Sequence, residues 1–120
     1  MENITHTRTE CERGIAALED ALYAIGGKWK LRIINALRES GKKRFNELQR
    51  LVKGISPRVL SNELKELEMN GFVKRIVHAQ SPVLVEYELT AYSDTLKDVL
   101  YSLIQWGTDH RERVKGMLHA

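Results

Sequence analysis

Apolar positions recur every three or four residues through the first half of the chain, a spacing typical of helices that bury one face. The pattern predicts a helix over residues 15–25, a second over about 28–39 and a short third over 45–52. A fourth helix is expected from Pro57 to Asn70. Ser56 suits its start, because a serine hydroxyl caps a free backbone amide and a proline at the first helical position has no amide to leave unpaired.

The pattern changes at Phe72, where β-branched residues gather and apolar residues then alternate strictly with glutamates. This change predicts two strands, over 72–78 and 85–89, joined by a hairpin loop. A long helix is expected from Thr90 toward the end of the chain. One face of this helix would carry an apolar stripe formed by Leu96, Val99, Leu100, Leu103 and Trp106.

The order of these elements predicts one fold. Residues 1–12 show no clear period and are expected to form an N-terminal arm, followed by a single domain over 13–120. A short helix, a tight turn at Gly54 and a capped helix make up a helix-turn-helix, and the hairpin beside it is a wing. We therefore expect an α+β, mainly helical protein, a winged helix-turn-helix with a long C-terminal dimerisation helix.

The fourth helix separates its charges in a way that suits a DNA groove. At about 100° per residue, its leucines form one face, and Arg58, Asn62 and Lys65 lie on the opposite face with Met69. The glutamates fall on the flanks between the two faces. Arginine can pair with guanine and asparagine with adenine, whereas a lysine suits a phosphate. The alternative is that this face is an ordinary solvated helix surface.

Other basic residues suit contact with phosphates, which position a protein on DNA without reading its sequence. Such groups precede the third helix (Lys42, Lys43 and Arg44) and lie at the base of the wing (Lys74 and Arg75). Each is equally consistent with an ordinary surface charge. The full set of candidate DNA-binding residues is Ser56, Arg58, Ser61, Asn62, Lys65, Lys43, Arg44, Lys74, Arg75 and Gln80.

Composition excludes several other classes of protein. The net charge of +3, from 19 Lys and Arg against 16 Asp and Glu, is too small to indicate nucleic-acid binding by itself. The one cysteine, Cys11, and four scattered histidines predict no metal site, and we expect no cofactor. No nucleophile or acid–base arrangement predicts an enzyme. The polar N-terminus and the lack of a long apolar run predict a cytoplasmic protein without membrane contact.

Several motifs together resemble the HxlR-type winged-helix regulators, which are related to the MarR group. They are Gly26-Gly27-Lys28-Trp29-Lys30, Arg44-Phe45-Asn46-Glu47-Leu48, Gly54-Ile55-Ser56, the run from Leu60 to Gly71, Val85-Glu86-Tyr87-Glu88-Leu89-Thr90 and Trp106-Gly107. The resemblance extends from about Cys11 to Gly107. It implies a homodimer formed through the first and last helices, with recognition helices in successive major grooves and wings that reach the flanking backbone.

The chain departs from the family pattern at two positions. Leu84 stands where the wing often carries an arginine before Val-Glu-Tyr, which leaves His78, Gln80 and Ser81 as the candidates for a wing contact. Glu12, rather than the usual proline, follows the N-terminal cysteine. In some regulators of this type that cysteine senses oxidants, so Cys11 is a candidate regulatory thiol. The alternative is that Cys11 only packs against the first helix.

Taken together, the residues predict a sequence-specific regulator of transcription that binds double-stranded DNA as a homodimer, at an inverted-repeat operator with half-sites about one helical turn apart. Thiol or ligand control is an added hypothesis. The alternative function is a winged-helix module for protein interaction that does not bind DNA sequence-specifically. For the last helix, the alternative is that its apolar stripe packs wholly onto its own domain.

Overall fold

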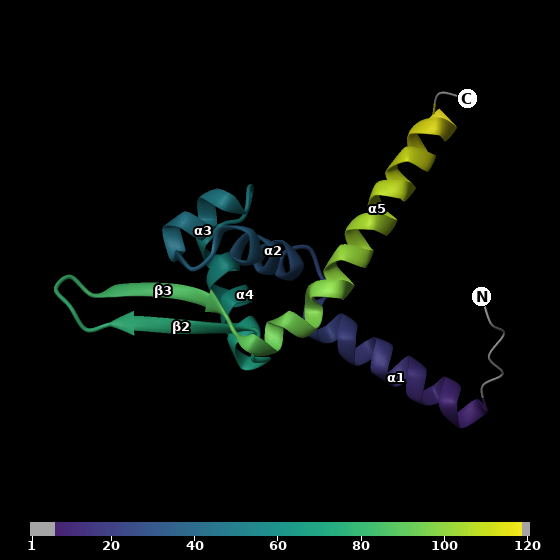
Figure 1. Ribbon diagram of the computed structural model, residues 1–120, viewed down its shortest axis with the longest axis horizontal. Helices are drawn as coiled ribbons and strands as arrows, with labels where there is room; N and C mark the ends of the chain where they lie inside the picture. Colours follow the sequence, from purple (N-terminus) through teal and green to yellow (C-terminus); the bar gives the residue numbers. More distant parts are fainter. Residues whose placement is uncertain (1–6, 119–120) are drawn as a thin grey trace.

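The computed structural model describes residues 7–118. Residues 1–6 of the expected arm, which include His6, lie outside it, as does His119. Figure 1 shows a small body from which the β2–β3 hairpin extends on one side and two helices, α1 and α5, extend on the other. The elements in chain order are α1 (Arg8–Ile25), α2 (Lys30–Ser40), β1 (Lys43–Arg44), α3 (Phe45–Leu51), α4 (Pro57–Met69), β2 (Val73–His78), β3 (Leu84–Leu89), η1 (Ala91–Leu96) and α5 (Lys97–Leu118).

The helix-turn-helix forms where it was predicted. The side chain of Ser56 accepts a hydrogen bond from the backbone amide of Val59 at 3.2 Å, and Pro57 occupies the first turn of α4. Gly54 in the turn before α4 has a φ of +88°, a conformation that L residues rarely adopt. The turn buries Ile55, which packs in the core with the leucines of α4.

The hairpin pairs β2 with β3 in the antiparallel register that places Arg75 opposite Tyr87. A third strand, β1, pairs with the free edge of β3, so the strand order in the sheet is β1-β3-β2. The sequence pattern did not predict a strand at Lys43–Arg44, which precede the third helix. Two residues are too short to show a strand period, and their pairing depends on an edge that only the folded hairpin provides.

The core lies where α2, α3, α4 and the base of the hairpin meet. Each helix contributes the apolar face that its spacing predicted, because these faces can be covered only by one another. The most deeply buried apolar side chains are Ile33, Ile34, Leu48, Leu60, Leu64 and Leu67.

Helix α1 begins at Arg8, earlier than the boundary of the predicted arm. Thr7 and Glu10 form a capping box: the amide of Glu10 donates to the Thr7 hydroxyl at 3.1 Å, and the amide of Thr7 donates to the Glu10 carboxylate at 2.8 Å. This reciprocal pair satisfies two amides that would otherwise lack partners at the helix start. The Thr-x-x-Glu spacing was present in the sequence, although this part of the chain lacks an apolar period.

Much of the apolar surface of α1 and α5 remains uncovered within one chain. On α1, Ile15, Leu18 and Leu22 are each more than half exposed, and only Ile25 is buried. On α5, Leu100 is the buried residue of the stripe, whereas Trp106 is 66% exposed. The stripe therefore does not pack wholly onto its own domain, and this alternative is excluded for the single chain.

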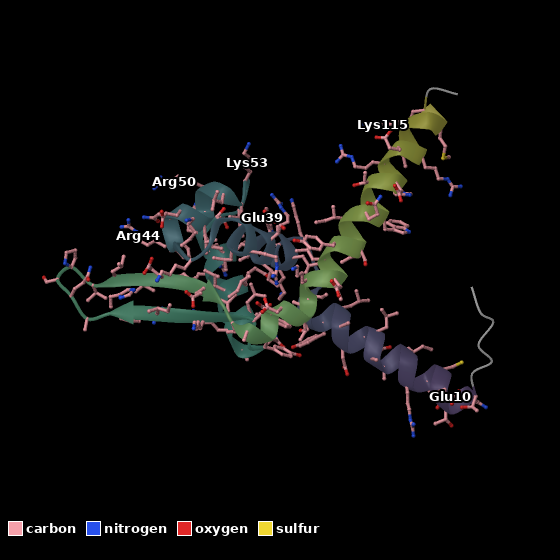
Figure 2. All side chains as sticks on the ribbon, in the orientation of Figure 1. Glu10, Glu39, Arg44, Arg50, Lys53 and Lys115 are labelled. Carbon is pink, nitrogen blue, oxygen red and sulfur yellow. The ribbon has the colours of Figure 1, made fainter. Side chains whose placement is uncertain are left out.

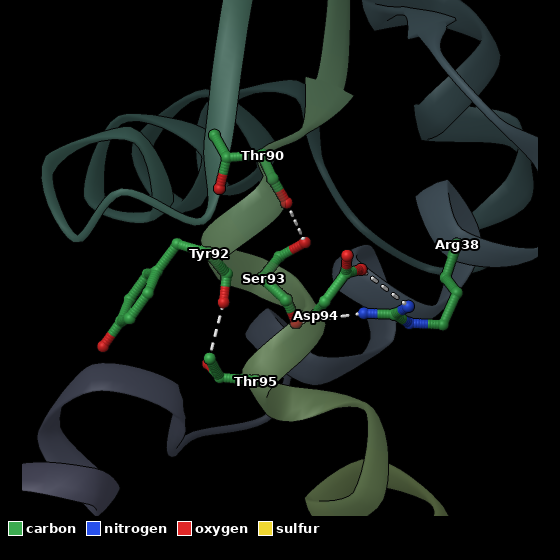
Figure 3. A network of polar contacts seen from close by, with 6 residues as sticks. All are labelled: Arg38, Thr90, Tyr92, Ser93, Asp94 and Thr95. Carbon is green, nitrogen blue, oxygen red and sulfur yellow. Dashed lines mark hydrogen bonds and ion pairs between the residues drawn. The ribbon is translucent and has the colours of Figure 1, made fainter.

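A polar junction holds the start of the last helix against the body (Figure 3). The guanidinium of Arg38, from α2, donates to the carbonyl of Ser93 at 3.0 Å and lies 3.5 Å from the carboxylate of Asp94. The buried hydroxyl of Ser93 donates to the carbonyl of Thr90 at 2.6 Å. Ser93 and Asp94 belong to a short 3-10 helix, η1, which was not predicted and which precedes α5.

Candidate nucleic-acid interface

The outer face of α4 is open to solvent over its whole length. Arg58, Asn62, Lys65 and Met69 are all exposed, whereas the leucines of the opposite face lie in the core. This is the division of faces that the spacing predicted. The open face presents two cations and one amide and no carboxylate, which is a suitable chemistry for the edges of bases and their phosphates.

Two carboxylates beside this face are held by α2. The ammonium group of Lys30 lies 2.9 Å from the carboxylate of Glu63 and 2.5 Å from that of Glu66. Burial disfavours the charge on Lys30, but the hydrogen bonds with Glu66 and Glu63 outweigh it and raise the pKa of Lys30 above its ordinary value of 10.5. The buried ammonium therefore draws both carboxylates toward α2 and offsets part of their charge.

The other flank of α4 meets the base of the hairpin. Ser61 and Lys65 of α4 line a hollow together with Arg75 and Tyr87 of the sheet, and Glu68 also borders it. The structure therefore brings three of the predicted DNA-binding residues (Ser61, Lys65 and Arg75) to one place. Sequence spacing alone did not show this grouping, because Arg75 belongs to a different element.

Lys74 is placed differently from its neighbour Arg75. Successive strand residues point to opposite faces of a sheet, so Lys74 lies on the face away from Tyr87. Its ammonium group lies 3.1 Å from the carboxylate of Glu88 on the paired strand. Lys74 therefore stands apart from the group formed by Ser61, Lys65 and Arg75, and an ion pair already occupies it.

Arg44 and Gln80 lie on either side of a second hollow, between the start of α3 and the hairpin loop. The amide of Arg44 donates to the carboxylate of Glu47 at 2.9 Å, an arrangement that begins α3. This backbone bond lowers the pKa of Glu47 below its ordinary value of 4.5, because it favours the charged carboxylate. Lys43, opposite Tyr87 in the sheet, is only partly exposed.

The hairpin loop offers two of the three wing candidates to solvent. Gln80 and Ser81 are exposed, whereas the Nε2 atom of His78 lies 2.8 Å from the carboxylate of Glu86 on the next strand. His78 is therefore engaged inside the hairpin. Ser56, by contrast, is exposed, but its hydroxyl already caps α4 by accepting a hydrogen bond from Val59.

Cys11 is exposed on α1, an element separate from the helix-turn-helix. Helical spacing places it on the same stripe as Ile15, Leu18 and Leu22, the residues that one chain leaves uncovered. The guanidinium of Arg8 pairs with Glu12 at 3.4 Å rather than standing free beside the thiol.

Three further basic residues, Lys28, Arg32 and Lys53, were not among the DNA-binding candidates predicted from the sequence. Lys28 and Arg32 flank the ring of Trp29, each 4.7 Å from its centre, and Arg32 also donates to the carbonyl of Lys53 at 2.9 Å. The closeness of Lys28 and Arg32 around an aromatic residue was visible in the chain. The addition of Lys53 depends on how α2 packs beside the turn that follows α3.

Other kinds of site receive no support within residues 7–118. This part of the chain has no group of three His, Cys, Asp or Glu side chains arranged to hold a metal ion. None of its helices combines the length and hydropathy needed to span a bilayer.

Comparison with known proteins identifies the family. The profile of the HxlR-like helix-turn-helix family matches residues 24–115, from the end of α1 into α5. The chain belongs to this family. As an HxlR-like protein with relatives named HTH-type transcriptional regulators, it is a transcriptional regulator of the helix-turn-helix type. The resemblance stated from the sequence motifs is therefore confirmed.

Similar proteins support the HxlR-like assignment in sequence and in structure. YtcD of Bacillus subtilis (strain 168), an HTH-type transcriptional regulator, is 45% identical over 100 residues, which cover 83% of this chain and 79% of YtcD. The redox regulator HypR in its reduced form has a TM-score of 0.76 at 39% identity, over 83% of this chain and 98% of HypR. Diamide-treated YodB from B. subtilis has a TM-score of 0.66 at 31% identity, over 88% of this chain and 96% of YodB. The predicted winged-helix fold is thus confirmed.

Proposed function

We propose that this HxlR-like regulator binds double-stranded DNA sequence-specifically as a homodimer, with α4 in the major groove. The open face of α4 carries this proposal: Arg58, Asn62 and Lys65 are exposed on it, and Glu63 and Glu66 are turned toward Lys30. In this reading, Arg58 and Asn62 contact base edges, and Lys65 and Arg75 contact phosphates. Such a protein acts where the chromosome is, which in a bacterium is the cytoplasm.

The uncovered faces of α1 and α5 support the homodimer. An exposed stripe of large apolar side chains on a soluble helix usually marks a surface that another molecule covers. Here both helices leave the body on the same side, and both carry such a stripe (Figure 1). A second copy of the chain would supply the matching apolar surface. A two-fold dimer in turn requires an inverted-repeat operator, with half-sites about one helical turn apart.

The position of Cys11 supports control by oxidation. Its thiol lies on the stripe of α1 that the proposed dimer would cover, so a disulfide to another chain, or a mixed disulfide with a small thiol, would alter that surface. HypR is described as a redox regulator, and YodB is known in a diamide-treated form. We extend thiol control to this chain as part of the proposal.

One experiment separates DNA binding from the alternative of a protein-interaction module. The full-length protein is used to select duplexes from a random DNA pool, and the affinity for the selected sequence is then measured between 50 and 200 mM salt. We expect an inverted repeat and a loss of affinity of about 10³-fold or more, since each neutralised phosphate releases counterions. A pool without enrichment and a nearly flat salt response would favour the interaction module.

A further inference from the structure

Two cations lie over one aromatic ring, and one of them is bonded to the backbone of a third basic residue. The Nζ atom of Lys28 and the guanidinium carbon of Arg32 each lie 4.7 Å from the centre of the Trp29 ring. Arg32 also donates to the carbonyl oxygen of Lys53 at 2.9 Å, which ties α2 to the turn after α3. We call Lys28, Arg32 and Lys53 the Trp29 cation cluster. Figure 2 shows Lys53 pointing away from the body into solvent.

The charge of the Trp29 cation cluster is not compensated within the described part of the chain. All three residues are exposed, and none of them forms an ion pair with a carboxylate of residues 7–118. Nearby Lys30 shows the contrast, because it is buried and holds two carboxylates. Like charges repel one another, so a group of three exposed cations without acidic partners favours binding of a polyanion.

The cluster lies on a particular side of α4. Glu63 and Glu66, which contact Lys30 next to Trp29, occupy one flank of the helix, and Trp29 itself lies beside Gly54 in the turn before α4. Ser61 and Glu68 occupy the other flank, where Arg75 of the hairpin approaches. Trp29 therefore lies at the turn that leads into α4, and its neighbour Lys30 reaches the flank of α4 opposite the one that Arg75 approaches.

We propose that the Trp29 cation cluster binds the phosphate backbone along one edge of the major groove, while Arg75 and Lys65 bind the backbone along the other edge. The proposal rests on the proposed function, since α4 must enter the groove for its two flanks to face the two strands. A major groove is bordered by a phosphate strand on each side, and a helix within it has a flank toward each strand. The ring of Trp29 and the carbonyl of Lys53 keep Lys28 and Arg32 near their binding positions, which reduces the ordering cost on binding.

The test removes charge from the cluster without disturbing its framework. Lys28→Gln/Lys53→Gln leaves Arg32 on the ring and keeps the carbonyl of residue 53 that Arg32 uses. The matched control is Arg111→Gln/Arg113→Gln, which removes two exposed charges from the distal part of α5. Each full-length protein is titrated with the operator selected by the wild type, at several salt concentrations, and with a scrambled duplex.

We expect the salt slope of Lys28→Gln/Lys53→Gln to fall by about 3.6, since the dimer loses four phosphate contacts and each contributes about 0.9. Affinity at about 0.1 M salt should fall at least tenfold by the same relation. The preference for operator over scrambled duplex should stay unchanged, because phosphates carry no sequence information. The control pair should retain the wild-type slope, and thermal unfolding should be the same for all three proteins.

The possible failures are distinguishable. Wild-type protein without steep salt dependence would overturn the proposed function, and the role of the cluster with it. If Lys28→Gln/Lys53→Gln keeps the wild-type salt slope, the role of the cluster is overturned but the proposed function stands. This holds even if the affinity of the variant is weaker, because a loss of affinity at unchanged slope indicates a structural effect. Ethylation interference gives an independent readout: modified phosphates that block wild-type binding at one edge of the groove should no longer matter for the variant.

Discussion

The ammonium group of Lys30 on α2 lies 2.9 Å from the carboxylate of Glu63 on α4, and the same ammonium also holds Glu66. This contact joins the first helix of the body to the proposed recognition helix. It fixes the rotation of α4 about its axis, because the two glutamates are one turn apart and face the same cation. It also keeps two negative charges from acting unopposed beside the open face of α4.

Replacing Lys30 with methionine should therefore weaken both stability and DNA binding. The substitution keeps the length of the buried side chain but leaves Glu63 and Glu66 without their partner, and we expect a loss of about 2 kcal/mol in the free energy of unfolding. DNA affinity should fall as well, since the carboxylates then repel phosphates. Urea unfolding, compared at constant m-value, and operator titration measure the two effects.

The control is the triple variant Lys30→Met/Glu63→Gln/Glu66→Gln, which removes the uncompensated charges and should regain much of the lost DNA affinity. Because the pKa of Lys30 is raised above 10.5, its stabilising contribution is complete at neutral pH. This contribution is lost only as the pH rises through the folded-state value. Equal DNA affinity in Lys30→Met and the wild type would rule out the electrostatic role.

Arg58→Ala and Lys65→Ala should affect operator binding in different ways. Arg58 is expected to read a base, so its loss should cost about 1–3 kcal/mol and relax the preference at one base pair. Lys65 is expected to contact a phosphate, so its loss should weaken binding to all duplexes alike and lower the salt slope by about two, one for each subunit of the dimer. Titration of operators with single base changes tests both, and a uniform loss in Arg58→Ala would reassign Arg58 to a phosphate.

Leu103→Lys should break the proposed dimer while leaving the folded chain intact. Leu103 is 47% exposed within one chain, so a lysine there costs little until a second copy must cover it. Gln105→Lys, on the opposite face of α5, is the matched control and should stay dimeric. Sedimentation velocity distinguishes monomer from dimer, and an unchanged dimer in Leu103→Lys would place the interface elsewhere.

Cys11→Ser should abolish the response of DNA binding to oxidation. Diamide takes two electrons and two protons from a pair of thiols, so two chains, or one chain and a small thiol, become linked through a disulfide. The wild type should release the operator after this treatment and recover with dithiothreitol, whereas Cys11→Ser should bind throughout. Mobility shifts with parallel non-reducing gels follow both events. If Cys11→Ser releases DNA as the wild type does, the thiol hypothesis fails.

Glu47 should stabilise α3 only when it is ionised. Its pKa is lowered by the backbone bond from Arg44, so the stabilisation is present above the unfolded value of 4.5 and disappears as the pH falls through the lower folded value. We expect Glu47→Gln to melt at a lower temperature than the wild type at neutral pH. The two melting temperatures should converge in acid. A difference that persists at about pH 2 would mean that the carboxylate charge has no part in it.

The helices that bury their own apolar faces could be predicted with good accuracy. Leu60, Leu64 and Leu67 defined the inner face of α4, and Ser56-Pro57 defined its start, because periodicity and capping are local properties of the chain. The strands of the hairpin followed from the same reasoning. The strand β1 did not, because Lys43 and Arg44 pair with residues far away in sequence.

The candidate site divides in the same way. The sequence by itself determined which side chains α4 turns outward, since helical geometry is constant and its leucines must face the core. Only the tertiary structure decided which residues border that face: Arg75 on one flank, Lys30 on the other, and Lys74 away from both. The physical reason is that helix spacing acts within one element, whereas these neighbours are set by how separate elements pack and by the alternation of strand side chains.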